Sequence, residues 1–132
     1  MTLKAELPPN AYGYPDVVWE RFLLPEQAGW LEGDGILTIE ATSNADKAIL
    51  QLTIELDREE GRVEDALFLA YGCPVTIAVG DWLAEWLQSR ELTELRLSAR
   101  DIVLALEIPD HKTHCALMGE DIVRRLQEQV VT

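Results

Sequence analysis

Two cysteines and one histidine are the residues of this chain whose types and spacing could do chemistry. Cys73 follows Tyr71-Gly72 and precedes a proline, and Cys115 comes directly after His114. Each cysteine stands at the start of a predicted helix, where unpaired backbone N–H groups favour a thiolate and lower its pKa. Two thiolates and an imidazole are soft and borderline ligands, so these residues could bind a metal ion, and a thiolate of lowered pKa could also act as a nucleophile.

Each of these residues also has a simpler interpretation. A free cysteine often behaves as a small buried apolar side chain, and His114 alone could be an exposed helix cap. No C-x-x-C motif occurs, so the spacing is not that of a zinc finger. The adjacency of His114 and Cys115, together with a matching cysteine at a second helix start, favours the metal site.

Asp46 lies in a polar loop, 42–46, just before a predicted strand. An ordinary turn explains such a loop, because Asn and Asp side chains bond their own backbone. The functional alternative is that Asp46 supplies an oxygen ligand at the sheet edge that faces the cysteines. His111 is predicted to be a solvent residue.

Composition and charge limit the classes of protein to which this chain can belong. The chain has 132 residues, 48% hydrophobic and 27% charged, which is typical of one globular domain. No apolar run reaches the roughly 18 residues of a membrane span, and the N-terminus does not resemble a signal peptide, so we expect a cytoplasmic protein. In the reducing cytoplasm, a pair of thiols is more often used for metal binding or redox chemistry than for a disulfide. A formal charge of −13 argues against nucleic acid as a partner and favours a basic partner surface.

The predicted elements form an α+β fold. Residues 1–13 are expected to be a flexible tail and 14–132 a single domain. A short helix begins at Pro15 and ends before Pro25. Alternating apolar residues predict three strands, at 37–41, 48–56 and 63–71, with a hairpin turn at 57–61, so the sheet is antiparallel.

Three C-terminal helices are expected to cover one face of this sheet. The first starts near Cys73, and its apolar side is predicted to carry Val75, Ala78, Val79, Trp82, Trp86 and Leu87. The second opens with a capping-box pattern at 98–101 and runs through Leu106. The third runs from about His114 to Val130, with Cys115, Met118, Ile122 and Leu126 on one stripe. Strands followed by helices predict a two-layer fold.

The chain resembles a known family in its two cysteine segments. Tyr71-Gly72-Cys73 with Ile77-Ala78, and His114-Cys115-Ala116-Leu117 with Glu120-Asp121, are similar to the signature segments of the U-type iron–sulfur cluster scaffolds, the IscU and NifU N-terminal family. The resemblance extends from Tyr14 over nearly the whole chain. It includes Ala45-Asp46 before Leu50-Gln51-Leu52, which is similar to the segment leading into the family's central strand.

This resemblance implies a scaffold rather than an enzyme. Family members assemble a [2Fe–2S] cluster on three cysteines, with a nearby aspartate and the histidine before the last cysteine. By matching position, the cofactor or metal ligands here are Asp46, Cys73, His114 and Cys115. The resemblance further implies that sulfur comes from a cysteine desulfurase and that the cluster passes to apo iron–sulfur acceptor proteins.

The chain departs from the family pattern at two places. Asn44 stands where the family has its first cysteine, two residues before the aspartate. The family's Leu-Pro-Pro-Val-Lys stretch, read by a dedicated Hsp70 chaperone, is here Ile108-Pro109-Asp110-His111-Lys112, so docking of that chaperone is doubtful. Two thiolates, one nitrogen and one oxygen could hold a labile [2Fe–2S] cluster or iron, and the same set suits tetrahedral Zn²⁺.

Two functions therefore stay open from the sequence. The first is a divergent scaffold that binds a labile cluster or a metal ion and passes it to partners, favoured by the joint presence of the four ligands. The second is a pseudo-scaffold, an interaction or regulatory protein that keeps the fold without assembling a cluster, favoured by Asn44. A cysteine enzyme is disfavoured, because adjacent residues at a helix start rarely point at the same atom.

Overall fold

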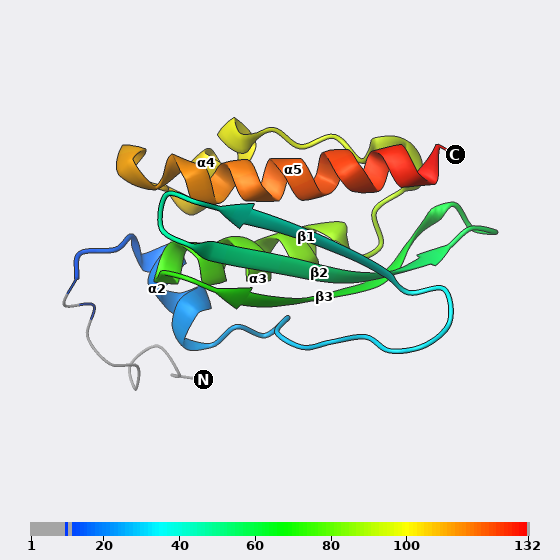
Figure 1. Cartoon of the computed structure of the whole chain (residues 1–132), viewed down its shortest axis with the longest axis horizontal. Coiled ribbons are helices and arrows are strands. Elements are labelled where there is room, and N and C mark those ends of the chain that lie inside the picture. Colours follow the sequence, from blue (N-terminus) through cyan, green and yellow to red (C-terminus); the bar gives the residue numbers. More distant parts are fainter. Residues whose placement is uncertain (1–9, 11, 132) are drawn as a thin grey trace.

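A three-stranded sheet with helices packed on it forms the described part of the protein. The computed structural model describes residue 10 and residues 12–131. In chain order the elements are α2 (Asp16–Leu23), β1 (Leu37–Ser43), β2 (Ala48–Asp57), β3 (Arg62–Tyr71), α3 (Pro74–Leu87), α4 (Ala99–Leu106) and α5 (Thr113–Val130), with short 3-10 turns at Leu92–Glu94 and Asp110–Lys112. Figure 1 shows their arrangement. The predicted α+β fold, the three strands and the four helices are confirmed.

The sheet is a pair of consecutive antiparallel hairpins in the order β1-β2-β3. Ser43 pairs with Ala48, so residues 44–47 form a four-residue loop, in which Lys47 has a φ of 56°. The second hairpin turns after Asp57, whose carboxylate accepts a hydrogen bond from the backbone N–H of Glu60 at 3.0 Å. The predicted turn at 57–61 is therefore confirmed.

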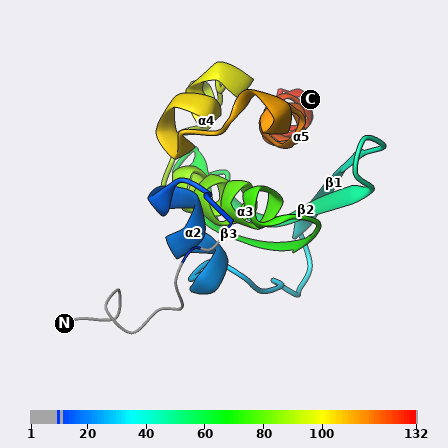
Figure 2. The same cartoon turned by 90° about the vertical axis from the view of Figure 1, so that its left-hand side faces the viewer.

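Helices α3 and α5 cover the same face of the sheet and begin at the same end of the molecule. β3 runs toward that end, where α3 turns back along the sheet; α5 starts there again after α4 (Figure 1). The end-on view of Figure 2 shows α3, α4 and α5 on one side of the strands. The β1–β2 loop lies at the same end, so three separate segments converge there.

The core lies between this sheet face and the helices. Alternate strand residues such as Ile39, Leu50 and Leu52 are buried. The predicted stripe of α5 is confirmed, because its four members are buried: Cys115, Met118, Ile122 and Leu126.

The predicted apolar side of α3 differs from the observed one. Trp82 and Trp86 are only partly buried and stack on each other, while Leu83 and Ala84 take fully buried positions. The helix packs against the sheet, α2 and α5, so most of its circumference is apolar and the periodicity does not define one face. The guanidinium of Arg90 lies 3.8 Å from the centre of the Trp86 ring.

The ends of α2 and α4 follow their sequence signals. Ser98 and Asp101 form both halves of the predicted capping box at the start of α4, and α2 ends before Pro25 as predicted. Most of the expected flexible tail, 1–13, lies outside the described residues. Of its described part, Asn10 accepts a hydrogen bond from the backbone N–H of Tyr14 at 3.1 Å.

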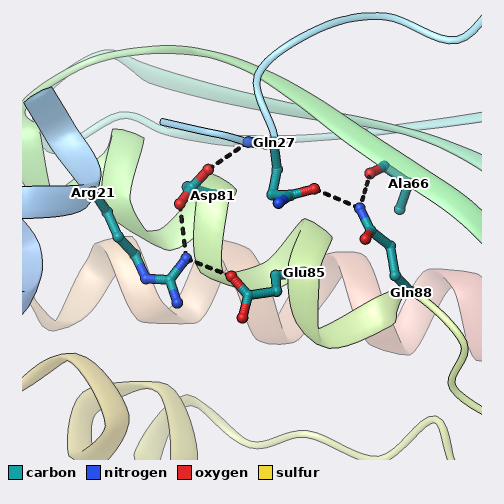
Figure 3. Close-up of polar contacts among 6 residues, drawn as sticks. All are labelled: Arg21, Gln27, Ala66, Asp81, Glu85 and Gln88. Atoms are coloured by element: carbon teal, nitrogen blue, oxygen red, sulfur yellow. Dashed lines mark hydrogen bonds and ion pairs between the residues drawn. The ribbon is translucent and has the colours of Figure 1, made fainter. Parts of the chain in front are cut away.

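A network of hydrogen bonds and ion pairs links α2 and the segment that follows it to side chains of α3 and to Gln88 just after this helix (Figure 3). Asp81 is buried, and its two oxygens accept hydrogen bonds from Arg21 Nη1 at 2.7 Å and from the backbone N–H of Gln27 at 2.8 Å. Gln88 donates to Gln27 Oε1 at 2.6 Å and to the carbonyl of Ala66 at 2.9 Å. The network thereby holds α2 and the start of the next segment against the helix that carries Cys73 at its beginning.

Within residues 12–131, none of the helices is both long enough and apolar enough to cross a bilayer.

Candidate metal centre

Cys73 is positioned by the sharp passage from β3 into α3. It is the N-cap residue of α3, with Pro74 as the first helical residue, where a missing N–H costs no hydrogen bond. Gly72 before it has a φ of 155°, which favours glycine. The Cys73 side chain is half-buried and lines an open hollow together with Asp46 and Lys112.

Cys115 lies in the first turn of α5 and is fully buried. Its Sγ is 3.9 Å from Sγ of Cys73. Two thiolates on a tetrahedral ion with bonds of about 2.3 Å would lie about 3.8 Å apart, so this spacing suits a shared metal. The hydroxyl of buried Thr76 lies 3.4 Å from Sγ of Cys115 and 3.6 Å from Sγ of Cys73. The pair is therefore held by two helices and one bridging hydroxyl.

Asp46 brings a carboxylate to the two thiols. One of its oxygens and the two sulfur atoms all lie within 4.8 Å of one another. Oδ1 of Asp46 is buried and has no hydrogen-bond partner among the described residues. A buried carboxylate oxygen without a partner is costly unless a cation or proton satisfies it, so the donor set fits a metal ion.

His114 contacts the carboxylate and not the thiols. Its Nε2 lies 2.9 Å from Oδ2 of Asp46. The structure thus brings Asp46, Cys73 and Cys115 together as a mutual group and places His114 beside them as a hydrogen-bond partner of Asp46. In this arrangement His114 orients the carboxylate, as residues next to metal ligands commonly do.

Lys112 completes the surroundings of the site. Its Nζ lies 4.0 Å from Oδ2 of Asp46, and its side chain is 19% exposed. Burial is the largest single influence and alone would lower the pKa of Lys112, but the charge of Cys73, a hydrogen bond with Cys73 and smaller contributions from neighbouring groups together outweigh it, so the pKa of Lys112 is raised. A cation thus stands against a cluster of potential anions in a protein that is otherwise strongly acidic.

The two thiols differ in protonation. A hydrogen bond from Cys115, helped by Thr76, lowers the pKa of Cys73 well below that of a free cysteine. Sharing its proton with Cys73, together with burial, raises the pKa of Cys115. The hydrogen bond with His114 lowers the pKa of Asp46, although burial opposes the change. These shifts favour the ionised form at Cys73 and Asp46 and the neutral thiol at Cys115.

Asn44 and His111 stand outside this group. Asn44 is exposed and lines a second hollow with His114, Met118 and other residues of α5, whereas Asp46 lines the hollow of Cys73. His111 is exposed, as expected from the sequence.

Two residues of the site, Thr76 and Lys112, were not predicted from the sequence. Thr76 has a weak signal, since a hydroxyl three residues after an N-cap cysteine lies one turn away from it. Lys112 has no such signal in the sequence, because its position beside Cys73 depends on how the 3-10 turn before α5 packs.

Comparison with known proteins gives a family match over nearly the whole chain. The model of the NifU-like N terminal domain matches residues 13–128. The chain is 30% identical over 118 residues to the iron–sulfur cluster assembly scaffold protein IscU of Haemophilus influenzae, covering 84% of this chain and 90% of that protein. It is 35% identical over 122 residues to the nitrogen fixation protein NifU of Azotobacter chroococcum mcd 1.

Several of these relatives are longer than the matched region. The match covers 90% of this chain but 38% of the Azotobacter NifU protein. The chain is 35% identical over 77 residues to the IscU scaffold of Buchnera aphidicola, and this match covers 58% of the chain and 59% of that protein. These names describe scaffolds and a nitrogen-fixation protein, which agrees with the expectation that the chain is not an enzyme.

Solved structures share the fold. A scaffold protein of the SUF system from Fervidobacterium islandicum AW-1, described as putative in its own name, superposes with a TM-score of 0.65 at 14% identity, covering 85% of this chain and 94% of that chain. The N-terminal part of a NifU-like protein from Brucella abortus superposes with a TM-score of 0.61 at 16% identity, covering 86% and 93%. With the match over residues 13–128, the chain belongs to the family of NifU-like N-terminal domains.

Proposed function

We propose that this protein is an iron–sulfur cluster assembly scaffold that holds a labile [2Fe–2S] cluster or a metal ion and passes it to acceptor proteins. The observation that carries the proposal is the mutual proximity of Asp46, Cys73 and Cys115, whose ligand atoms lie within 4.8 Å of one another. The names of the IscU relatives support the same role. A cysteine desulfurase would supply the sulfur.

The ligand roles follow from the contacts. Cys73 and Cys115 would provide two thiolates, and Asp46 would provide an oxygen that has no other partner. His114 would hold Asp46 through Oδ2 or, after releasing it, act as a nitrogen ligand. A set with two thiolates suits a weakly held, exchangeable cargo, and Zn²⁺ is an alternative occupant.

Purification without oxygen tests this function. Iron, acid-labile sulfide and zinc are measured per chain, together with the visible spectrum. Iron and sulfide in equal amounts with cluster absorption are expected for the wild type, and Cys73→Ala should lose them. His114→Ala should weaken binding, while His111→Ala, an exposed histidine three residues earlier, is the matched control and should not. A Cys73→Ala protein with unchanged cluster absorption would contradict the assignment.

The second candidate, a pseudo-scaffold, is favoured by Asn44. Its exposed side chain lines the hollow beside α5, on a loop where the family carries a thiol ligand. Absence of metal after reconstitution with iron, sulfide and a desulfurase would support this candidate. Asn44→Cys separates the two, because a restored thiol should lengthen the lifetime of a cluster only if position 44 can turn toward Cys73.

A further inference from the structure

We propose that the metal centre takes one ligand from outside the chain, the thiolate of a small thiol that also carries a carboxylate. This co-ligand would bind in the hollow that Asp46, Cys73 and Lys112 line. The inference rests on the proposed scaffold function, because it concerns the same bound metal.

The described residues offer three ligand atoms in one mutual group. One oxygen of Asp46 and the sulfur atoms of Cys73 and Cys115 lie within 4.8 Å of one another. A tetrahedral ion takes four ligands, and a site with three protein ligands binds its fourth ligand from solvent. The group therefore suits an ion that shares its coordination with a second molecule.

His114 and Asn44 are turned to other contacts. Nε2 of His114 lies 2.9 Å from Oδ2 of Asp46, so this nitrogen is engaged with a ligand residue. Asn44 is exposed and lines a different hollow from that of Cys73. The sequence contains two cysteines, both already in the group. A third thiolate on the metal must therefore come from another molecule.

The accessible side of the ligand group is the hollow beside Cys73. Asp46 and Cys73 both line it, whereas Cys115 is fully buried. The hollow has a volume of about 470 Å³, which is within the range of small-molecule sites. Ala70 and Ile77 contribute apolar surface to its wall. A thiol of the size of a modified cysteine can therefore approach an ion at Asp46 and Cys73 and still contact the protein.

Lys112 is the feature of this hollow that selects a carboxylate. Its Nζ lies 4.0 Å from Oδ2 of Asp46, and its side chain is 19% exposed. Among the described residues that line the hollow, it is the one cation. An ammonium group has three N–H donors, so it can pair with a second carboxylate while it stays beside Asp46. An anionic thiol would gain this ion pair in addition to the metal–sulfur bond, and a neutral thiol would not.

Binding of the co-ligand is a ligand exchange without a redox step. The thiol releases its proton to solvent, its sulfur forms a bond to the ion, and a water ligand leaves the ion. No electron is transferred, so Cys73 and Cys115 keep their oxidation state.

The test uses the full-length protein loaded with Co²⁺ without oxygen, because sulfur-to-cobalt charge-transfer absorption reports each bound thiolate. N-acetylcysteine and N-acetylcysteinamide are titrated in parallel. The two thiols differ in the carboxylate, and their blocked amine does not chelate the metal. Absorption should rise and saturate at one thiol per chain, with half-saturation at an about tenfold lower concentration for N-acetylcysteine. Equilibrium dialysis measures the cobalt that stays on the protein.

Variants of Lys112 test the source of this preference. Lys112→Ala should bind the two thiols equally, and Lys112→Arg should restore the preference for N-acetylcysteine. Lys47→Ala removes the exposed lysine next to Asp46, so it is the matched control and should behave as the wild type. Lys112→Gln replaces the alanine variant if that variant does not fold by circular dichroism.

Several results would overturn the proposal. They are an absorption that neither thiol changes, equal affinity of the wild type for the two thiols, an unchanged preference in Lys112→Ala, and loss of cobalt from the protein as thiol is added. Thiol uptake by His114→Ala but not by the wild type would show that His114 fills the position instead. Failure of the metal site itself is distinguishable, because the wild type would then show no cobalt absorption before any thiol is added.

Discussion

Replacing Gly72 by alanine should damage both the fold and the site, because the added methyl group would press on the Thr76 hydroxyl that lies beside both cysteines. An added Cβ would lie 2.9 Å from Oγ1 and 3.1 Å from Cβ of Thr76, and 3.1 Å from Cβ of Ala48. Gly72 also has a φ of 155°, which side-chain-bearing residues rarely adopt. Steric contact and backbone strain therefore act together at this position.

The size of the effect follows from these two terms. The backbone conformation costs about 1–3 kcal/mol for a residue with a side chain, and forcing a methyl group into packed surroundings costs about 1–3 kcal/mol. We expect a loss of about 2–6 kcal/mol in the free energy of unfolding. For a chain of this size each kcal/mol lowers the melting temperature by roughly 3–6 °C.

Gly33→Ala is the matched control, and urea denaturation is the assay. Gly33 has a φ of 137° but no atom within 4 Å of its added Cβ, so its substitution carries the backbone strain without the contact. It should cost about 1–3 kcal/mol. The double variant Gly72→Ala/Thr76→Ala, compared with Thr76→Ala alone, should show a smaller penalty for the alanine at position 72.

Equal losses of stability in Gly72→Ala and Gly33→Ala would refute the steric argument. So would an unchanged penalty in the Thr76→Ala background, because the closest contact of the added Cβ is the Thr76 hydroxyl. The rate of Cys73 alkylation gives an independent reading. It should change in Gly72→Ala and stay at the wild-type value in Gly33→Ala.

Three further predictions concern the site and its support. The pH profile of Cys73 alkylation should have its midpoint well below the free-cysteine value of about 8.5, and Thr76→Val should move it upward because a hydrogen bond to the thiolate is lost; a midpoint near 8.5 in the wild type would contradict this. Asp81→Asn should destabilise the fold by about 1–3 kcal/mol in urea denaturation, because a buried carboxylate loses its charge beside a guanidinium; a loss below about 0.5 kcal/mol would show that the pair contributes little. The pKa of Asp46 lies below its unfolded value, so its ionised form stabilises the fold above about pH 4, and this contribution is lost as the pH falls through the lowered pKa. His114→Ala should raise the pKa of Asp46 in a carboxyl NMR titration. An unchanged pKa would show that the hydrogen bond with His114 is not the cause of the shift.

Periodicity and capping residues were sufficient to predict the elements of this fold. Alternation at Leu50, Leu52 and Ile54 identified the central strand, because its residues on one face must all be buried. Ser98 and Asp101 identified the start of α4, because their bonds are local in sequence. Strand alternation and helix capping depend on residues that are close together in the sequence, so both can be predicted from the sequence alone.

Side-chain orientation depended on tertiary packing and was harder to predict. Trp82 and Trp86 were assigned to the apolar side of α3, yet they are only partly buried. The helix packs against the sheet and against α2, α4 and α5, so Leu83 and Ala84 take fully buried positions that the periodicity did not single out. Lys112 reaches Asp46 through a turn whose position is set by the packing of α5. Contacts between residues 66 positions apart leave no periodic trace in the sequence (112 − 46 = 66).

The site is built from two parts that differ in how firmly the fold holds them. Cys73 and Cys115 stand at the starts of α3 and α5, both packed on the sheet, and a buried hydroxyl spans them. Asp46 stands on the loop 44–47, and the residue at position 44 is exposed on that same loop. A substitution at position 44 therefore removes a potential loop ligand without disturbing the helix-borne thiol pair. An ion satisfied by two thiolates and a carboxylate would keep its ligands after this change, whereas a cluster that requires a third thiolate would not, so the identity of the bound cargo depends on the loop more than on the helices.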